Sequence, residues 1–309
     1  MRRSLGISFS SDKIYFTEIT EDNEALKLDH TSFASVDFDF EDELGKHKSV
    51  QRDLDNVAHE LSKYISKRNR NYDKVSVCIS TSQAFILKLP IDYSEGKQSL
   101  TTKVYWELSH YLPDDYNDYV INTYRLNQFM PVRESDYFIL IAVHKFTIEF
   151  IKRVFKLANI NIDVIDIDYF ASEYALRQSS SAELENKKIV LIGLKDNRID
   201  FGFIDNKKFK SYTSVKYSNP AEFNLTLVKK LNSLLNDGFK GAEKFIFYGD
   251  EISDDTVQTL QKNGIKADIL NPFESIFASD KLLNDDELRG SVYKYSSSCG
   301  AAIRGLKAS

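Results

Sequence analysis

The sequence predicts an α/β protein with two similarly organised halves, and three observations carry this prediction. Segments of alternating apolar and polar residues, rich in β-branched and aromatic side chains, are interspersed with segments of helical periodicity. Both halves open in the same way, with three short strands joined by a polar turn and an acidic turn. A serine-rich polar stretch at residues 176–188 separates the halves. A helix and a later strand follow in each half, so the pattern favours duplicated mixed sheets.

The first half begins with an apolar strand, a turn of small polar residues and a second strand, in the sequence LGISFSSDKIYFTEI at residues 5–19. Further strands are predicted at residues 26–33, 75–79, 85–89, 119–126, 137–143 and 162–167. Apolar residues keep helical spacing at residues 54–65, 100–112 and 151–158. Each of these three segments predicts a helix with one buried face.

The second half contains predicted strands at residues 189–194, 199–204, 208–214, 245–248 and 265–270. The clearest helix begins in the sequence SNPAEF, where Asn219 is the expected N-cap, Pro220 occupies the first turn and Glu222 follows three residues after the cap. Leu227 and Leu231 belong to its apolar stripe. This helix is therefore expected to cover one face of the second sheet.

Composition and charge exclude several classes of protein. Hydrophobic residues make up 42% and charged residues 28% of 309 residues, which is ordinary for a folded chain of one or two domains. The formal net charge of -5 and the absence of a long basic run argue against a nucleic-acid partner. No apolar stretch approaches the roughly 18 residues that span a bilayer, and the basic start MRRS lacks the apolar segment of a secretory signal. We therefore expect a cytoplasmic protein that does not itself cross the membrane.

Cysteine and histidine usage predicts no metal centre. Cys78 and Cys299 lie in apolar or small-residue stretches without a CxxC pattern, so both are expected to be buried free thiols. The five histidines are scattered without ligand spacing. The motifs GxSxG, HExxH and GxxxxGK[ST] are also missing, which removes the commonest nucleophile, zinc and P-loop interpretations.

Two acidic stretches are interpreted as structural. The sequence DFDFEDE at residues 37–43 is expected to form a solvated connection between a strand and the following helix. The sequence VIDIDYF alternates apolar residues with Asp166 and Asp168, as a half-exposed strand that runs into a helix N-cap would. Neither stretch is expected to be catalytic.

Four stretches resemble one known family in collinear order. They are LGISFSSDKIYFTEI, VYWELSHYLPDDYNDYVINTYRL, FILIAVHKFTIEFIKRVFKLANINIDVIDIDYFAS, and KFIFYGDEISDDTVQTLQKNGIKADILNPFES together with the terminal SCGAAIRGL. The first is similar to a motif LGxDxGxxxxKxxEL, the second to WExxxYIP, and the last carries the tripeptide NPF. These motifs resemble the PilM family, the actin-like proteins of the type IV pilus assembly platform, and more distantly the cell-division protein FtsA.

The resemblance implies an actin-like ATPase (ribonuclease H-like) fold with two duplicated halves and an inserted subdomain in the first. The first half is then expected at residues 1–184, with the inserted subdomain at about residues 83–160. The second half, at residues 185–309, is expected to be shortened, because little more than one helix separates its hairpin from the strand KFIFYGD. A helix at its C-terminal end is expected to pack back on the first half.

In actin-like ATPases the opening hairpins of the two halves hold the nucleotide phosphates, and the first one departs from that chemistry here. Glycine lets backbone N–H groups approach the phosphates, and aspartate organises Mg²⁺. Aligned to the family motif, the aspartate falls on Ser8, the following glycine on Ser10 and the lysine on Tyr15. Gly6 is retained, and Lys13 is a candidate substitute for the lysine.

The second and third phosphate motifs depart in the same way. Gly193 stands where the second aspartate belongs, Lys195 stands where the glycine belongs, and Asp196 comes two or three residues late. The usual glycine pair before the adenosine-contacting helix is reduced to Gly249 followed by Asp250. These positions define a degenerate nucleotide cleft.

The degenerate cleft predicts a relative that does not hydrolyse ATP and needs no cofactor. A triphosphate needs N–H cradles or cations, and the Mg²⁺ organisers are replaced. Hydroxyls of Ser8, Ser10 and Ser11, with Lys195, could still bind an anion, so Mg²⁺–ATP remains the alternative. The competing hypothesis is an active ATPase or a sugar-kinase-like phosphotransferase of the same fold. A third is that only the fold is shared and the partner system is unrelated.

The helix at residues 100–112 carries aromatic side chains on more than one face, although core packing explains each of them singly. The resemblance implies that this helix belongs to the inserted subdomain, which with the first half forms a groove for the N-terminal peptide of a membrane partner. The candidate groove residues are Tyr105, Trp106, Glu107, Tyr111 and Pro113. We therefore expect a scaffold that binds a protein or peptide, such as the cytosolic N-terminus of an inner-membrane protein, and that is peripheral to that membrane. Whether the chain also forms a homo-oligomer is left open.

Overall fold

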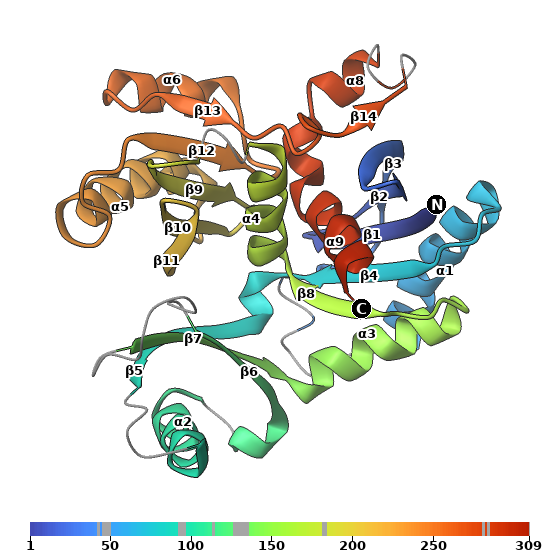
Figure 1. Ribbon diagram of the computed structural model, residues 1–309, viewed down its shortest axis with the longest axis horizontal. Coiled ribbons are helices and arrows are strands. Elements are labelled where there is room, and N and C mark those ends of the chain that lie inside the picture. The colour runs from blue at the N-terminus through green and yellow to red at the C-terminus, as the bar shows by residue number, and fades with distance from the viewer. Residues whose placement is uncertain are drawn as a thin grey trace.

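The computed structural model describes residues 1–41, 44, 51–91, 97–112, 115–125, 136–180, 184–279, 282 and 285–308. Within these residues the chain forms two large mixed sheets, a small antiparallel sheet and helices that cover them (Figure 1). No helix among them is long and apolar enough to cross a membrane.

The first sheet opens with a hairpin, as the sequence predicts. β1 (Arg2–Ser10), β2 (Lys13–Asp22) and β3 (Ala25–Ser35) pair in antiparallel fashion, and β4 (Lys74–Ile79) lies parallel to β1 on the other side. β8 (Val164–Ile167) and the two-residue β14 (Phe277–Ala278) complete the described order β14-β3-β2-β1-β4-β8.

The second sheet repeats this layout. β9 (Lys188–Leu194), β10 (Arg198–Asp205) and β11 (Lys208–Lys216) form the antiparallel part. β12 (Lys244–Tyr248) and β13 (Ala267–Ile269) add to β9 in parallel, which gives the described order β11-β10-β9-β12-β13. Strand for strand this matches β3-β2-β1-β4-β8, so the two sheets share one topology. The division of the chain at residue 184 stays a prediction.

A small sheet lies between β4 and β8 in the sequence. β5 (Ala84–Ile91), β7 (Asp136–His144) and β6 (Tyr119–Arg125) are antiparallel in the order β5-β7-β6. α2 (Lys97–Tyr111) covers one face, and α3 (Lys145–Leu157) returns the chain to the first sheet. Since β4 and β8 are neighbours in the first sheet, this segment is an insertion between two adjacent strands.

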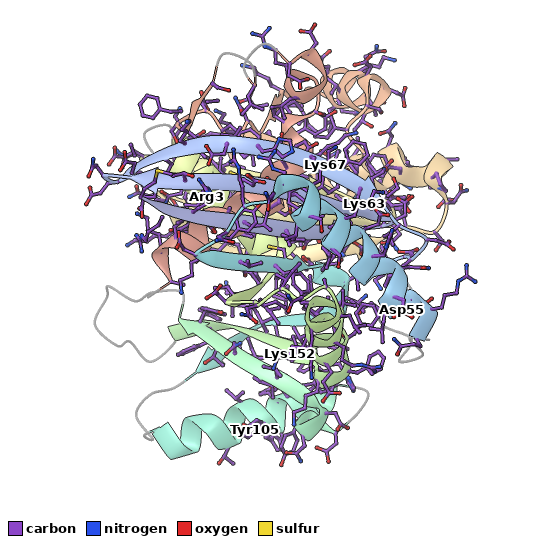
Figure 2. The ribbon with its side chains drawn as sticks, turned by 90° about the vertical axis from the view of Figure 1, so that its right-hand side faces the viewer. Arg3, Asp55, Lys63, Lys67, Tyr105 and Lys152 are labelled. Atoms are coloured by element: carbon purple, nitrogen blue, oxygen red, sulfur yellow. The ribbon has the colours of Figure 1, made fainter. Side chains whose placement is uncertain are left out.

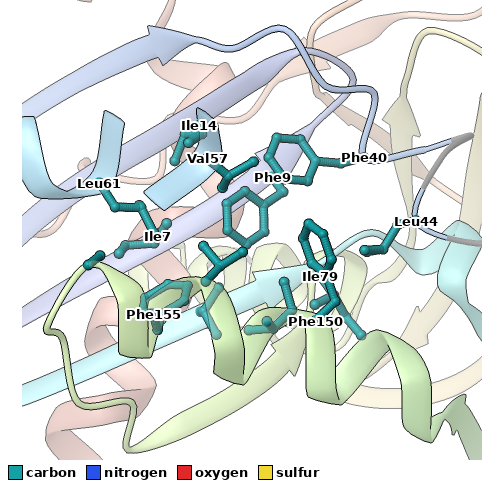
Figure 3. Close-up of a cluster of buried hydrophobic side chains, with 14 of the residues drawn as sticks. Ile7, Phe9, Ile14, Phe40, Leu44, Val57, Leu61, Ile79, Phe150 and Phe155 are labelled. Carbon is teal, nitrogen blue, oxygen red and sulfur yellow. The ribbon is translucent and has the colours of Figure 1, made fainter. Parts of the chain in front are cut away.

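The first core lies between the first sheet, α1 (Gln51–Arg68) and α3. Ile7 and Phe9 of β1 meet Val57 of α1 and Phe155 of α3, as Figure 3 shows. Phe9 stacks on Phe40 with ring centroids 4.3 Å apart. Phe38, Phe40 and Glu41 are buried, so the expectation of a solvated connection at residues 37–43 is wrong for these residues. Residues 42–43 lie outside the described ranges.

Two helices fill the space between the sheets. α4 (Asp168–Ser179) packs on the second sheet, and α9 (Ser296–Lys307) packs on β1, β2 and β4 of the first sheet (Figure 1). α9 approaches closely because it meets glycine and small residues. A Cβ on Gly6 would lie 1.9 Å from the Ser298 carbonyl oxygen, and a Cβ on Gly300 would lie 1.8 Å from that of Ala171.

The helices of the second sheet include α5 (Phe223–Asp237) and α6 (Asp254–Lys262). Asn219 caps as predicted, since its side chain accepts a hydrogen bond from the Ala221 N–H, although a single 3-10 turn precedes α5. A short helix, α8 (Asp286–Arg289), follows β14. The prediction of buried free thiols at Cys78 and Cys299 is also confirmed.

Candidate functional site

The first hairpin, in the place of a phosphate loop, is a tight two-residue turn. Ser10 pairs with Lys13 across it, and Ser11 adopts φ 47°. Ser8 lies within β1 opposite Tyr15 and is 2% exposed, so its hydroxyl is not presented to a cleft. The Ser11 carbonyl accepts a hydrogen bond from the Phe40 N–H at 2.9 Å. The backbone of this turn is therefore already hydrogen-bonded to the segment that contains Phe40.

The second hairpin joins β9 to β10 and is equally closed. The Lys195 N–H donates to the Arg198 carbonyl at 2.9 Å, so this amide is used within the turn. Gly193 faces the Tyr248 ring, and a Cβ there would lie 2.7 Å from the Tyr248 hydroxyl. Asp196 is exposed at the tip and is hydrogen-bonded to the Ser11 side chain of the first hairpin.

The third loop, after β12, packs against the second hairpin. Gly249 adopts φ 107°, and a Cβ there would lie 2.2 Å from the Leu194 carbonyl oxygen, so only glycine fits. The Gly249 N–H donates to the Tyr293 carbonyl at 3.4 Å. The Asp250 carboxylate accepts hydrogen bonds from the Ser10 hydroxyl at 2.5 Å and from the Tyr15 hydroxyl at 2.6 Å. The three predicted phosphate loops are thus tied to one another.

Beneath these loops lies a buried set of ionised side chains, which we call the central charge cluster. Its members come from the loop after β3, the start of α4, the second hairpin and β10, and are Glu41, Asp168, Lys195, Arg198 and Asp200. None of them is more than 5% exposed.

Arg198 is the hub of the central charge cluster. Its guanidinium donates to Glu41 at 2.9 Å, to Asp168 at 3.3 Å and to Asp200 at 2.9 Å. It also donates to the Ser80 hydroxyl at 2.8 Å. Because planar guanidinium groups match carboxylates well, one arginine can satisfy this many acceptors.

Asp168 accepts further hydrogen bonds and lies close to a second cation. Its carboxylate accepts the Thr81 N–H at 2.9 Å and the Tyr169 N–H at 2.7 Å, and the Lys195 ammonium lies 3.5 Å away. The Thr81 hydroxyl donates to the same carboxylate. Asp168 is fully buried, so the expectation that it belongs to a half-exposed strand end is wrong.

Neighbouring charges favour the ionised forms of Asp168 and Lys195, whereas burial has the larger effect on the pKa of Asp200. Burial opposes ionisation of Asp168, but Lys195 and Arg198 lower its pKa below the ordinary value. Burial likewise opposes the charged form of Lys195, yet Asp168 and Asp250 raise its pKa. For Asp200, burial outweighs the attraction of Arg198 and raises the pKa to about 6.

The outer rim of the loops is acidic. The pKa of Asp196 is raised by its partial removal from water and by the charges of Asp39 and Glu41. The pKa of Glu251 is raised by burial and by Asp196 and Asp250, while Lys13 opposes the shift. An incoming polyphosphate would therefore meet like charge at this rim.

The candidate groove residues lie on α2. Trp106 is 61% exposed and Tyr111 53% exposed; Tyr105 stacks on Tyr116 with centroids 4.8 Å apart. Glu107 is half-buried, and Pro113 lies outside the described residues. Figure 2 shows Tyr105 on α2 at the lower end of the molecule, far from Lys63 and Lys67 on α1.

α2 and the first core lie on opposite faces of the small sheet. Ile139 and Ile141 of β7 belong to the first core, whereas Leu140 and Ala142 pack with Leu108 of α2. The exposed α2 aromatics therefore form an outer surface and do not face the first sheet. Their role in partner binding stays a prediction.

Tyr124 of β6 lies on the side of the inserted segment that approaches the first sheet. Tyr124 is 54% exposed, and burial and the charge of Asp166 raise its pKa, with Arg304 opposing. Asp166 of β8 and Arg304 of α9 form an ion pair. The phenol thus lies near this pair, at the edges of the small sheet and the first sheet.

The sequence singled out the loops but missed the buried charges beneath them. Glu41 and Asp168 belong to the two acidic stretches that the sequence pattern predicts to be structural, and no role is predicted from it for Arg198 or Asp200. One signal was available, since Arg198 and Asp200 alternate with the apolar residues Ile199 and Phe201 along one strand. Among the described residues no group of three His, Cys, Asp or Glu side chains could hold a metal ion.

Comparison with known proteins confirms the predicted fold. The family model of the type IV pilus assembly protein PilM matches residues 6–212. A solved PilM-PilN type IV pilus biogenesis complex is 15% identical, covers 98% of both chains and has a TM-score of 0.80. A Bacteroides thetaiotaomicron protein with actin-like ATPase fold and unknown function is 15% identical, covers 88% of this chain and 91% of its own, and has a TM-score of 0.54. No curated protein matches the chain. The fold is therefore actin-like.

Proposed function

Because the chain belongs to the family of the type IV pilus assembly protein PilM, we propose that it is a cytoplasmic scaffold that does not hydrolyse nucleotides. Its partner is a peptide segment of a membrane-associated protein in a pilus or secretion-type assembly. The similar solved structure is a complex of PilM with PilN, which supports a protein partner for this chain as well.

The observation that carries the nucleotide-free part of the proposal is the closed state of all three loops. The N–H groups of Lys195 and Gly249 donate within the protein, and Tyr248 fills the space at Gly193. The cations Lys195 and Arg198, which could neutralise phosphate, are already paired with buried carboxylates. A triphosphate would have to displace these partners, and each displaced carboxylate would be left buried and unpaired.

The exposed aromatic side chains of the inserted segment support the peptide-binding part. Trp106 lies edge-to-face on His110 with centroids 4.5 Å apart, and the Tyr105–Tyr116 stack lies on the same subdomain. Tryptophan and tyrosine supply most of the binding energy at many interfaces because they bury a large area at small entropic cost. We therefore place the partner on the outer surface of α2.

The test uses synthetic peptides with the cytosolic N-terminal sequences of inner-membrane proteins from the same organism, titrated by fluorescence anisotropy. We expect Trp106→Ala and Tyr111→Ala each to weaken binding about tenfold or more. Phe277→Ala is the matched control, because Phe277 is an aromatic residue that is 72% exposed on β14, away from the small sheet. It should bind like the wild type.

Two outcomes would overturn the placement. Unchanged affinity in both α2 variants would remove this surface from the interface. A loss confined to Tyr124→Ala would move the peptide to the side of the subdomain near Asp166 and Arg304, while a scaffold function would survive. Absence of binding by the wild type would reject the proposed partner class.

A further inference from the structure

We propose that Arg198 and Asp250 form a permanent latch, which fixes the two large sheets in one closed arrangement without a bound ligand. In this latch, side chains of the protein itself bridge the loops that open the two sheets. The proposal goes beyond partner binding, because it concerns the conformational freedom of the whole chain and not the surface of α2.

The first part of the latch is the set of contacts that Arg198 makes. It belongs to β10 of the second sheet, but Glu41, Ser80 and Asp168 all come from the chain that builds the first sheet and the start of α4. These partners lie 157, 118 and 30 residues away in sequence. Lys195 adds a further contact to Asp168. One strand of the second sheet is thus attached to three separate segments.

The second part of the latch is formed by Asp250, which follows β12. It accepts hydrogen bonds from Ser10 and Tyr15 of the first hairpin, 240 and 235 residues away in sequence. Tyr15 is 3% exposed and packs edge-to-face on Tyr295 at 5.3 Å. Its hydroxyl is therefore held in place by packing as well as by Asp250.

The Arg198 contacts oppose hinge opening because Arg198, Glu41 and Asp168 are all buried. A small opening would separate Arg198 from Glu41 and Asp168 before water could hydrate either charge, so it would expose unpaired charges to a medium of low polarity. In many proteins the two sides of a cleft close around a ligand that bridges them. Here the bridge is part of the sequence, so closure should need no ligand.

The test measures the distance between the sheets by electron paramagnetic resonance of paired spin labels. Labels at Ser66→Cys on α1 and Ser233→Cys on α5 report on the first and second sheets, and both positions are exposed. The native Cys78 and Cys299 are 0% exposed, so they should not react with the label. We expect one narrow distance distribution that Mg²⁺–ATP and the partner peptide leave unchanged.

Arg198→Met is the decisive variant, and we expect it to widen the distance distribution by about twofold or shift it to longer distances. Arg68→Met is the matched control. Arg68 also pairs with a buried carboxylate, Glu18, but both residues belong to the first sheet and its helix, so the distance should stay narrow. The combined Ser10→Ala and Tyr15→Phe variant removes the Asp250 contacts without leaving a buried charge, and it decides the matter if Arg198→Met fails to fold.

A folded Arg198→Met protein with the wild-type distribution would overturn the latch. If it does not fold, an unchanged distribution in the Ser10 and Tyr15 variant would do so. Equal widening in Arg68→Met would also overturn it, because the effect would then be general loosening. Peptide affinity is read separately, so failure of the latch and failure of the scaffold function are distinguishable.

Discussion

Asp200 is a buried carboxyl group whose pKa is shifted by its surroundings into the mildly acidic range. Burial raises its pKa to about 6 from an ordinary value of 3.8, although Arg198 and the Tyr212 hydroxyl both favour its charged form. With Asp200 protonated, the central charge cluster has two cations and two carboxylates. With Asp200 ionised, the cluster carries one excess negative charge away from water. The stability of the protein should therefore respond to pH in mildly acidic solution.

The sign of this response follows from the two pKa values. The unfolded chain loses the Asp200 proton near pH 4 and the folded chain near pH 6, so the stabilisation is full below pH 4 and is lost by pH 6. The decline amounts to about 3 kcal/mol in the free energy of unfolding. Asp200→Asn should lack it. Urea unfolding from pH 4 to pH 7 measures the difference between the two proteins, and parallel pH profiles would contradict the prediction.

At the residue scale, the sequence identified positions that lack the phosphate-binding residues of the family motif. It did not identify the side chains that surround a residue in the fold. The replacements at Ser8, Ser10 and Gly193 could be identified because a family motif supplies the expected residue. The contacts of Arg198 could not, because its partner Glu41 is 157 residues away and lies in a stretch that looks solvated. Burial of a charge depends on long-range packing, which alternation along one strand does not specify.

At the scale of elements, hydrophobic periodicity predicted the hairpins and most helices well. β1 to β3 and β9 to β11 follow the predicted order, because each strand alternates or is continuously apolar. The ends of the helices and the faces on which they pack were less predictable. α3 begins at Lys145, before its apolar stripe becomes clear, and the face on which α2 packs depends on the alternation of β7. Side-chain periodicity shows which face is buried but not against which neighbour.

The contact between α4 and α9 allows a sharp test of helix packing. Gly300→Ala would place a Cβ 1.8 Å from the Ala171 carbonyl oxygen, so the helices must separate. We expect a loss of about 1–3 kcal/mol in the free energy of unfolding, even though alanine favours helix.

Gly238→Ala at the end of α5 is the matched control. Its φ is −102° and a Cβ there would meet nothing within 4 Å, so alanine should be neutral or slightly stabilising. Chemical denaturation of the three proteins provides the comparison. Equal stability of the Gly300 variant and the wild type would show that α9 can shift without loss.

At the scale of the whole molecule, an actin-like fold is combined with an interior in which the cations Lys195 and Arg198 are already paired with carboxylates. We expect 1 mM Mg²⁺–ATP to shift the melting temperature by less than about 1 °C. A site with a dissociation constant of about 10 μM would instead add about 2.7 kcal/mol, or roughly 4 °C for a chain of this size. Thermal melts with ATP, with and without Mg²⁺, measure this. A shift of several degrees that requires Mg²⁺ would support the competing ATPase hypothesis.

The packing of α9 on the first sheet also sets the order in which the protein can fold. The Thr17 and Ser298 hydroxyls are hydrogen-bonded at 2.7 Å, although 281 residues separate them. During synthesis on the ribosome, strands β1, β2 and β4 emerge long before α9, which covers them. One apolar face of the first sheet therefore stays exposed to solvent until α9 has been synthesised. Contacts so distant in sequence slow folding and lengthen exposure to aggregation. During synthesis this chain should therefore depend on chaperones until residue 307 has emerged.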